Sequence, residues 1–203
     1  MKKIAVVGYK GKMGRPIFLA LKEKFDVIGI GREDKLSVCN GLDLVIDVAS
    51  GESSVNSAEF CLKHHIPIII GSTGQSEEEN KRLKDISHKI VMIRKSNFST
   101  GFEILEKMID EVLKYNLESI EIVEKHHVNK KDAPSGTAIE LKKYIEKKYC
   151  VQVKIYSIRE GDEMGEHAIK FRLKKEEITI KHNVLSRQTF VDGVVKIAEN
   201  LLQ

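Results

Sequence analysis

The chain has 203 residues, which is enough to bury a hydrophobic core without disulfide bonds or a structural metal. Its 34 basic and 30 acidic residues leave a formal charge of only +4 and are mixed along the chain, which argues against nucleic acid as a partner. No apolar stretch approaches the length of a membrane span, and three cysteines without close spacing are typical of a reducing compartment. We therefore expect a cytoplasmic protein with no membrane or nucleic-acid partner, in which Cys39, Cys61 and Cys150 are packing residues.

Five short apolar runs in the first half of the chain, rich in Val and Ile, predict strands buried on both faces of a parallel sheet. They lie at residues 4–7, 26–30, 44–47, 67–70 and 90–93. Helical stretches over about 54–64 and 77–87 alternate with the later runs, and a capping box of Ser76 with Glu79 opens the second. The connection over 32–43 is short for a full crossover helix. This alternation predicts a trimmed Rossmann-type domain.

The pattern changes after residue 98. A helix over 101–113, started by Thr100 with Glu103, precedes segments of alternating polarity at 120–123, 167–173 and 178–180, which predict a sheet with one solvent-exposed face. Another helix is expected over 135–148, and an apolar stripe over 190–201 predicts a last helix that covers the first domain. We expect an α/β protein of two domains: a parallel-sheet domain of residues 1–97 and 185–203, and a smaller α+β domain with a mixed sheet, residues 98–184.

Three glycines, Gly8, Gly11 and Gly14, stand where the first strand ends and the first helix begins. They permit a tight turn and the close approach of a pyrophosphate to the helix start, although glycines also end strands for steric reasons. Residues 71–74 and 95–98 follow later strands at the edge where doubly wound sheets bind ligands. Each of these segments alone could equally be a turn and helix cap. Together they predict a dinucleotide cofactor.

The end of the second strand bears on the choice of cofactor. A site that prefers NAD usually has an acid there for the ribose hydroxyls, and this sequence has Gly31 followed by Arg32. The guanidinium of Arg32, helped by Lys10 or Lys12, would suit a 2′-phosphate. We therefore predict a preference for NADPH with some use of NADH. The alternative is that Arg32 is a solvated loop residue.

Two adjacent histidines, His126 and His127, lie at the end of a predicted strand over 119–125, so their side chains should point to opposite faces. This arrangement argues against a shared metal, and we expect no metal site. By contrast, the pair His64 and His65 ends a polar helix with no lysine or glycine loop nearby, which indicates a structural role.

A lysine and a helix start follow this histidine pair. Lys130 lies in a loop, and Pro134 with Ser135 marks a helix whose first amides include those of Gly136 and Thr137. A histidine that exchanges protons near neutral pH, an ammonium and a helix start within twelve residues favour a small anionic substrate. The alternative is a structural histidine whose hydrogen bonds are satisfied, beside an ordinarily capped helix.

Six motifs occur in a fixed order along the chain: Gly8-x-x-Gly-Lys-Met-Gly14, Gly71-Ser-Thr-Gly74, Ser96-Asn-Phe-Ser99, Glu124-x-His-His-x-x-Lys-x-Asp-Ala-Pro-Ser-Gly-Thr-Ala138, Ser157-x-Arg159 and Ser186-Arg-x-x-Phe190. In this order, over nearly the whole chain, the sequence resembles the 4-hydroxy-tetrahydrodipicolinate reductase (dihydrodipicolinate reductase) family. The chain is shorter than typical members, and Ser72 stands where threonine is common. The resemblance implies NAD(P)H-dependent reduction of 4-hydroxy-tetrahydrodipicolinate to tetrahydrodipicolinate in lysine and diaminopimelate biosynthesis.

The resemblance also implies roles for individual residues. His126 would be the proton donor or acceptor and Lys130 a proton donor, while the substrate carboxylates would be held by His127, Ser135, Gly136, Thr137 and Thr73. The cofactor, NADPH in preference to NADH, would contact Gly8, Lys10, Gly11, Lys12, Met13, Arg32, Gly71, Ser72, Thr73, Lys95, Ser96, Asn97 and Phe98. A homotetramer formed through the second domain and closure about a hinge near Phe98 and Ser186 are further expectations.

Two other functions remain open from the sequence. The first is another two-domain dehydrogenase that acts on an amino or hydroxy acid, which would share the first domain but leave the second half unexplained. The second is a non-catalytic nucleotide-sensing module, which would bind the cofactor without turnover. No DNA-reading segment supports that module.

Overall fold

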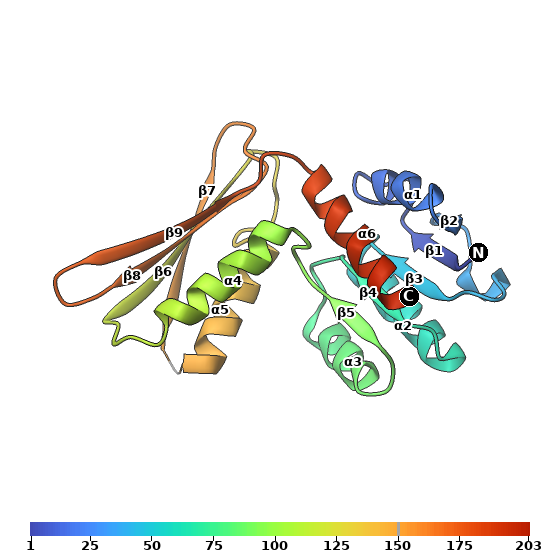
Figure 1. Ribbon diagram of the computed structural model, residues 1–203, viewed down its shortest axis with the longest axis horizontal. Coiled ribbons are helices and arrows are strands. Elements are labelled where there is room, and N and C mark those ends of the chain that lie inside the picture. The colour runs from blue at the N-terminus through green and yellow to red at the C-terminus, as the bar shows by residue number, and fades with distance from the viewer. Residues whose placement is uncertain (150) are drawn as a thin grey trace. The chain divides into compact units, whose positions relative to one another are not determined.

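The computed structural model describes residues 1–149 and 151–203 and divides the chain into two units (Figure 1). Unit 1 comprises Met1–Phe98 and Phe190–Gln203, and unit 2 comprises Ser99–Thr189. The sequence placed the two boundaries at 97/98 and 184/185. In the structure these boundaries lie at 98/99 and 189/190, one and five residues further along the chain.

Unit 1 is built on a parallel sheet of five strands, as the apolar runs predicted. The strands are β1 (Lys3–Val7), β2 (Asp26–Ile30), β3 (Leu44–Asp47), β4 (Ile68–Ile70) and β5 (Met92–Arg94), in the order β2-β1-β3-β4-β5. The order reverses between β1 and β3, and ligands of such sheets bind at the carboxyl ends of the strands beside this switch point. The glycine loop leaves β1 at that edge.

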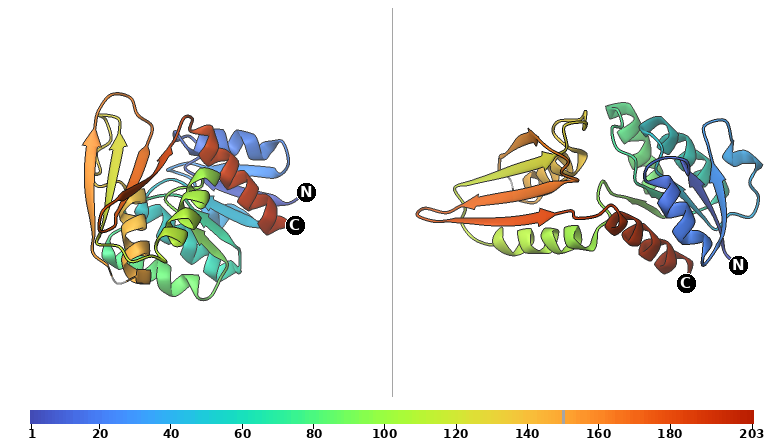
Figure 2. Two further views of the ribbon diagram at one scale, coloured as in Figure 1. Left: turned by 60° about the vertical axis from the view of Figure 1, so that its left-hand side comes forward. Right: turned by 90° about the horizontal axis from the view of Figure 1, so that it is seen from above.

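Helices cover both faces of this sheet (Figures 1 and 2). On one face α1 (Gly14–Lys22) and α6 (Gln188–Leu202) pack on Ile4, Val6 and Ile46, so the last helix covers the first domain as its apolar stripe predicted. On the other face α2 (Gly51–His64) and α3 (Glu77–Ser87) pack on alternate residues of the same strands. Burial on both faces explains why the strands lack polar alternation.

Two local predictions for unit 1 are confirmed. The connection from β2 to β3 contains only η1, a single 3-10 turn (Leu36–Val38), so there is no crossover helix between them. At the start of α3, the Ser76 hydroxyl accepts from the amide of Glu79 at 3.2 Å, and the Glu79 carboxylate accepts from the Ser76 amide at 2.7 Å. This reciprocal pair is the predicted capping box.

Unit 2 has a mixed sheet covered on one face by two helices. Its elements are α4 (Thr100–Val112), β6 (Ser119–His126), α5 (Gly136–Tyr149), β7 (Val153–Arg159), β8 (Glu166–Arg172) and β9 (Glu177–Asn183). The strand order is β7-β6-β8-β9, with β6 parallel to β7 and the other pairs antiparallel. Apolar side chains of α4 and α5 pack on alternate residues of these strands, which confirms the mixed α+β domain.

One prediction for unit 2 needs correction, and one strand was not predicted. The cap of α4 is Ser99, whose hydroxyl accepts from the amide of Phe102 at 3.2 Å, because the helix already begins at Thr100. Strand β7 was not predicted from periodicity. Its apolar residues Tyr156 and Ile158 are 48% and 41% exposed, so the strand does not show the expected contrast between a wet and a dry face.

The two cysteines within the described residues pack against the core of unit 1, and Cys150 lies outside those residues. Cys61 is fully buried on α2, and Cys39 is half-buried beside the same cluster. Burial raises the pKa of the Cys61 thiol to about 12, so it is not a nucleophile near neutral pH.

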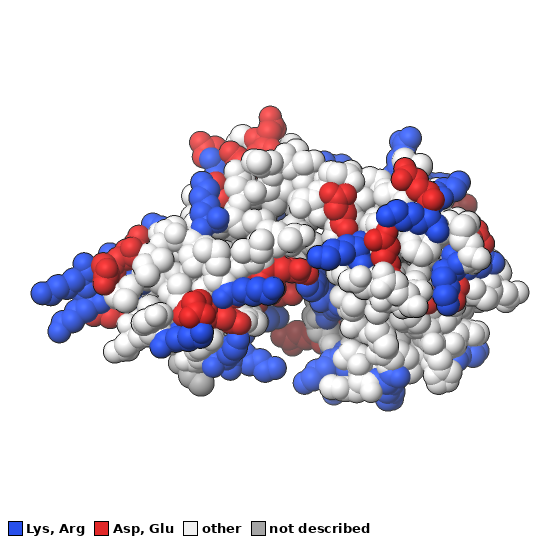
Figure 3. All heavy atoms as spheres, in the orientation of Figure 1, with Lys and Arg blue, Asp and Glu red and all other residues white. Residues whose placement is uncertain are grey.

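The surface carries both signs of charge. Figure 3 shows basic and acidic side chains interspersed over the face in view. Within the described residues, no helix combines the length and apolar character needed to cross a membrane.

Candidate active site

The glycine loop makes a tight turn between β1 and α1. Gly8 has φ +82°, a conformation that favours glycine, and the amide of Gly11 donates to its carbonyl at 2.9 Å. A Cβ on Gly14 would lie 2.1 Å from the Gly8 carbonyl oxygen, so this position has no room for a side chain. The N-cap residue of α1 is Met13, whose side chain makes no capping hydrogen bond. These features fit a pyrophosphate at the helix start.

The end of β2 lies beside this loop. The amide of Gly8 donates to the carbonyl of Ile30 at 2.9 Å, and Gly31 follows directly. The Asp34 carboxylate folds back and accepts from the Gly31 amide at 2.8 Å. A carboxylate therefore does lie at the end of the second strand. This corrects the expectation, based on Gly31 and Arg32, that no acid would be there. Arg32 and Lys12 are exposed, and Lys10 reaches the same strand end.

The segments after β4 and β5 lie at neighbouring strand ends because these strands pair. A Cβ on Gly71 would lie 3.0 Å from the ring of Phe98, so the two segments are in contact. Ser72 is anchored by the Gln75 amide group, and Thr73 is exposed. Asn97 is buried, and the Phe98 ring belongs to the core beneath α6. Lys95 and Ser96, both half-buried, precede them. The predicted cofactor residues of unit 1 thus share one edge of the sheet.

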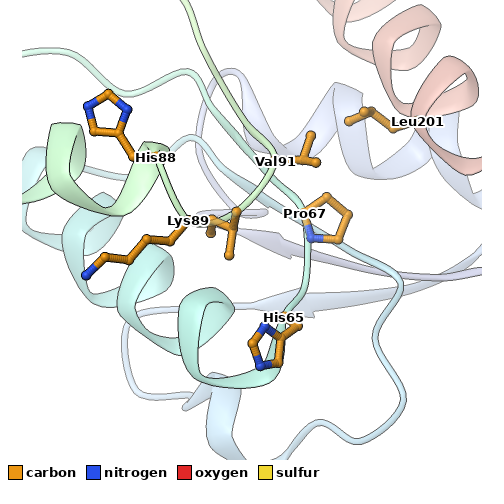
Figure 4. A pocket seen from close by; sticks show the side chains of 7 residues that line it. His65, Pro67, His88, Lys89, Val91 and Leu201 are labelled. Carbon is orange, nitrogen blue, oxygen red and sulfur yellow. The ribbon is translucent and has the colours of Figure 1, made fainter.

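A surface pocket of about 520 Å³ lies at the opposite edge of this sheet, where β4 and β5 begin. Figure 4 shows the side chains that line it, which include His65, Pro67, His88, Lys89, Val91 and Leu201. Pro67 and Val91 directly precede the two strands. This pocket is therefore separate from the candidate cofactor site at the carboxyl ends.

In unit 2, the centre of the candidate site is the carboxylate of Glu124 on β6, whose side chain is fully buried. It accepts from both terminal nitrogens of Arg159, at 2.9 and 2.8 Å, from the amide of Ser135 at 3.2 Å, and pairs with Nδ1 of His126. Burial alone would raise the pKa of Glu124, but hydrogen bonds from Arg159, Ser157 and His126 outweigh it and lower the pKa to about 2. The carboxylate is ionised and fixed.

This carboxylate determines the state of His126. Because Glu124 can only accept at Nδ1, the ring carries its proton there and leaves Nε2 as an acceptor. Burial lowers the pKa of His126, and the hydrogen bond and charge of Glu124 oppose that shift only in part. The imidazole is therefore neutral near pH 7. On its Nε2 side, a Cβ on Gly165 would come within 3.1 Å, so Gly165 keeps that edge clear.

Lys130 and the start of α5 meet at Asp132. The Lys130 ammonium lies 2.8 Å from a carboxylate oxygen of Asp132. Burial alone would raise the pKa of Asp132, but Lys130 and the amide of Gly136 together lower it. A carboxylate thus already lies between an ammonium and the first turn of a helix, the setting that the sequence predicted for a substrate carboxylate.

The other predicted residues of this segment have distinct surroundings. The Ser135 hydroxyl is buried, accepts from the amide of Ala138 at 3.2 Å and lies 3.3 Å from Nε2 of His167, so it caps α5. Thr137 is buried in the first turn. His127 leaves the strand with its amide donating to the carbonyl of Glu163, and its buried Nδ1 has no hydrogen-bond partner among residues 1–149 and 151–203.

Sequence reasoning gave no role to His167. It is 2% exposed, its ring lies 5.3 Å from that of His126, and burial is the main cause that lowers its pKa to about 3. His167 lies on β8 directly opposite Glu124. This position could have revealed its role, but it depends on the register of β8 against β6. Within the described residues, no group of three metal-ligating side chains is arranged to hold an ion. His64 and His65 end α2, where His64 stacks on Phe60.

Solved structures share this two-unit fold. A dipicolinate-bound dihydrodipicolinate reductase from Paenisporosarcina sp. TG-14 superposes with a TM-score of 0.74 at 20% identity, covering 99% of this chain and 94% of that one. Aspartate dehydrogenase from Thermotoga maritima gives 0.68 at 13% identity, covering 100% and 97%. The glycine loop on a parallel sheet, joined to a mixed-sheet unit, defines the class as that of two-domain proteins with a Rossmann-type sheet.

The sequence narrows the class further. Residues 28–98 match the family model described as dihydrodipicolinate reductase, N-terminus, and residues 101–203 match the corresponding C-terminus. The chain belongs to the dihydrodipicolinate reductase family. It is 33% identical to 4-hydroxy-tetrahydrodipicolinate reductase of Thermosipho africanus, over 98% of this chain and 91% of the relative. The enzyme of Caldanaerobacter subterraneus subsp. tengcongensis is 34% identical, over 100% and 93%.

Proposed function

We propose that this chain is an NAD(P)H-dependent reductase that converts 4-hydroxy-tetrahydrodipicolinate to tetrahydrodipicolinate in lysine and diaminopimelate biosynthesis. The observation that carries the proposal is membership of the family over both units, with His126, Lys130 and the start of α5 in the family motif. The Paenisporosarcina reductase is described with bound dipicolinate, a ring with two carboxylates. That ligand supports a small cyclic dicarboxylate as the substrate of this chain.

The residues of unit 2 have separate roles toward such a substrate, in binding it and in transferring protons. When bound, a reduced nicotinamide cofactor would supply a hydride to C4 of the ring after the 4-hydroxyl has left as water. His127, Thr137 and the amide of Gly136 hold the carboxylates, while Ser135 supports the helix start through its cap. Hydride addition builds negative charge on the ring. Lys130, whose ammonium is paired with Asp132, donates the proton that neutralises this charge. His126, which is neutral near pH 7, offers its Nε2 atom as a proton acceptor.

The cofactor proposal rests on unit 1. Residues 8–13 would wrap the pyrophosphate, and the segments after β4 and β5 would contact the nicotinamide half. Lys10 and Arg32 at the end of β2 favour a 2′-phosphate, so NADPH is the preferred cofactor and NADH is also used. Closure of the units about Phe98 and Ser186, with Thr73 meeting the substrate, stays a prediction, as does a cytoplasmic location.

The proposal includes a homotetramer formed through the mixed sheet. On β7, Tyr156 and Ile158 point to the face that α4 and α5 leave uncovered and are 48% and 41% exposed. Exposed apolar residues at adjacent positions of one sheet face support an interface with a second copy.

The test of function is turnover by the purified chain. The substrate is generated in place by the preceding synthase, and oxidation of NADPH is followed at 340 nm. We expect cofactor oxidation that depends on the synthase and its substrates. Reversible oxidation of an amino or hydroxy acid with NAD, and none with the synthase product, would favour the alternative dehydrogenase. Cofactor binding without any turnover would indicate a nucleotide-sensing module.

A further inference from the structure

We infer that the carboxylate of Asp34 accepts the ribose hydroxyls of the cofactor's adenosine half, in place of the acid that dinucleotide-binding sheets carry at the end of their second strand. Asp34 would thereby limit the preference for a 2′-phosphate and allow NADH to bind. The inference rests on the proposed function only in requiring that a nicotinamide dinucleotide binds unit 1.

The geometry at Gly31 supports this role. The Asp34 oxygen that accepts from the Gly31 amide at 2.8 Å would lie 3.1 Å from a Cβ on Gly31. The carboxylate thus occupies the space into which a side chain at position 31 would extend. Because a carboxylate has two oxygens, the second stays able to accept from a ribose hydroxyl.

The strand end is also in the right place relative to the glycine loop. Val7 pairs with Ile30, and the amide of Gly8 donates to the Ile30 carbonyl, so β2 ends level with the first glycine. The ring of Tyr9 packs over Gly29, where a Cβ would lie 2.5 Å from the ring. The loop therefore folds onto the end of β2, where the adenosine half lies in sheets of this type.

Charges of both signs meet at this strand end. The Cε of Lys10 lies 4.0 Å from the same Cβ position on Gly31, and Arg32 is the next residue. These cations attract a 2′-phosphate, while Asp34 accepts from a free 2′-hydroxyl and repels the phosphate. A site with both would bind both cofactors, with the balance set by two adjacent side chains.

A purely structural role for Asp34 makes a different prediction. If Asp34 only ties the turn through the Gly31 amide, Asp34→Asn keeps an oxygen for that bond and should leave both cofactors unaffected. If it binds the ribose, Asn replaces the second acceptor with an NH2 group, which cannot accept. NADH should then lose affinity, and NADPH should bind equally well or more tightly.

The experiment measures dissociation constants of NADH and NADPH by titration calorimetry of the purified full chain, without substrate. For Asp34→Asn we expect NADH to weaken about tenfold, the size of one hydrogen bond to a charged group. For Arg32→Ala we expect the opposite, about a tenfold loss for NADPH alone. Asp26→Asn, at the other end of β2, is the matched control and should change neither.

The outcomes separate this inference from the proposed function. Equal changes of both cofactors in Asp34→Asn, or no change, would overturn the role of Asp34. Failure of the wild-type chain to bind either cofactor would overturn it together with the proposed function. Tight binding with the expected shifts, but no reduction of the synthase product, would leave Asp34 assigned and remove the proposed function. Circular dichroism of Asp34→Asn checks that the variant is folded.

Discussion

The fully buried Glu124 is the residue on which the state of the candidate site depends. A buried carboxylate is costly unless its lone pairs are used, and here Arg159, Ser135 and His126 use them. This fixes the proton of His126 on Nδ1. The motif identified Glu124, His126 and Arg159 as family positions, but their hydrogen bonds could not be predicted, because they depend on the register of β7 against β6.

Removal of the Arg159 guanidinium should destabilise the fold. In Arg159→Met the Glu124 carboxylate is left buried without its main partner, which costs about 3 kcal/mol of unfolding free energy. The measurement is urea denaturation at pH 7. Lys125→Met is the matched control, because Lys125 pairs at the surface with Glu160, and it should lose much less. Equal losses in the two variants would contradict the buried network.

Acid should destabilise the protein through its buried histidine. The pKa of His167 is about 3 in the folded chain, below the usual value of 6.5, so the unfolded chain binds the proton first. Its contribution to stability is complete above pH 6.5 and is lost as the pH falls toward 3. We expect the unfolding free energy to fall over this window and His167→Gln to reduce the slope. Urea titrations at pH 7, 5.5 and 4 measure it, and an unchanged slope would contradict a buried neutral His167.

At the scale of elements, the sequence predicted what local chemistry determines. Five strands, the capping box at Ser76 and the helical stripes of α4 and α6 follow from periodicity and capping alone. β7 was missed because its outward residues are apolar, and the cap of α4 was misplaced by one residue because Ser99 and Thr100 both carry a hydroxyl. The reach of Asp34 back to Gly31 depends on a loop conformation that no pattern encodes.

The two hydroxyls at the start of α4 offer a direct comparison. Ser99→Ala removes the acceptor for the Phe102 amide and should cost about 1 kcal/mol of unfolding free energy. Thr100→Ala removes an exposed side chain within the first turn and should cost less. Thermal unfolding of the two variants distinguishes the caps. A larger loss in Thr100→Ala would restore the capping box expected from the sequence.

For the whole molecule, the proposed cofactor residues lie in unit 1, whereas the proposed substrate residues other than Thr73 lie in unit 2. The proposed homotetramer gives a mass prediction: light scattering after gel filtration should yield four times 23.0 kDa. Ile158→Arg, on the uncovered face of the mixed sheet, should lower this mass, whereas Ile104→Arg, at an exposed position of α4, should not. A monomeric wild-type chain would contradict the assembly without affecting the site.

In the proposed reaction, His126 and Lys130 carry the proton chemistry of a dicarboxylate reductase. These roles are tested by kcat for NADPH oxidation with the synthase-generated substrate in wild type, His126→Gln, Lys130→Met and the neighbouring Lys131→Met. We predict losses of about a hundredfold or more for the first two variants, as for general acid–base groups, and near wild-type turnover for Lys131→Met. Wild-type turnover in Lys130→Met and His126→Gln would contradict these two roles.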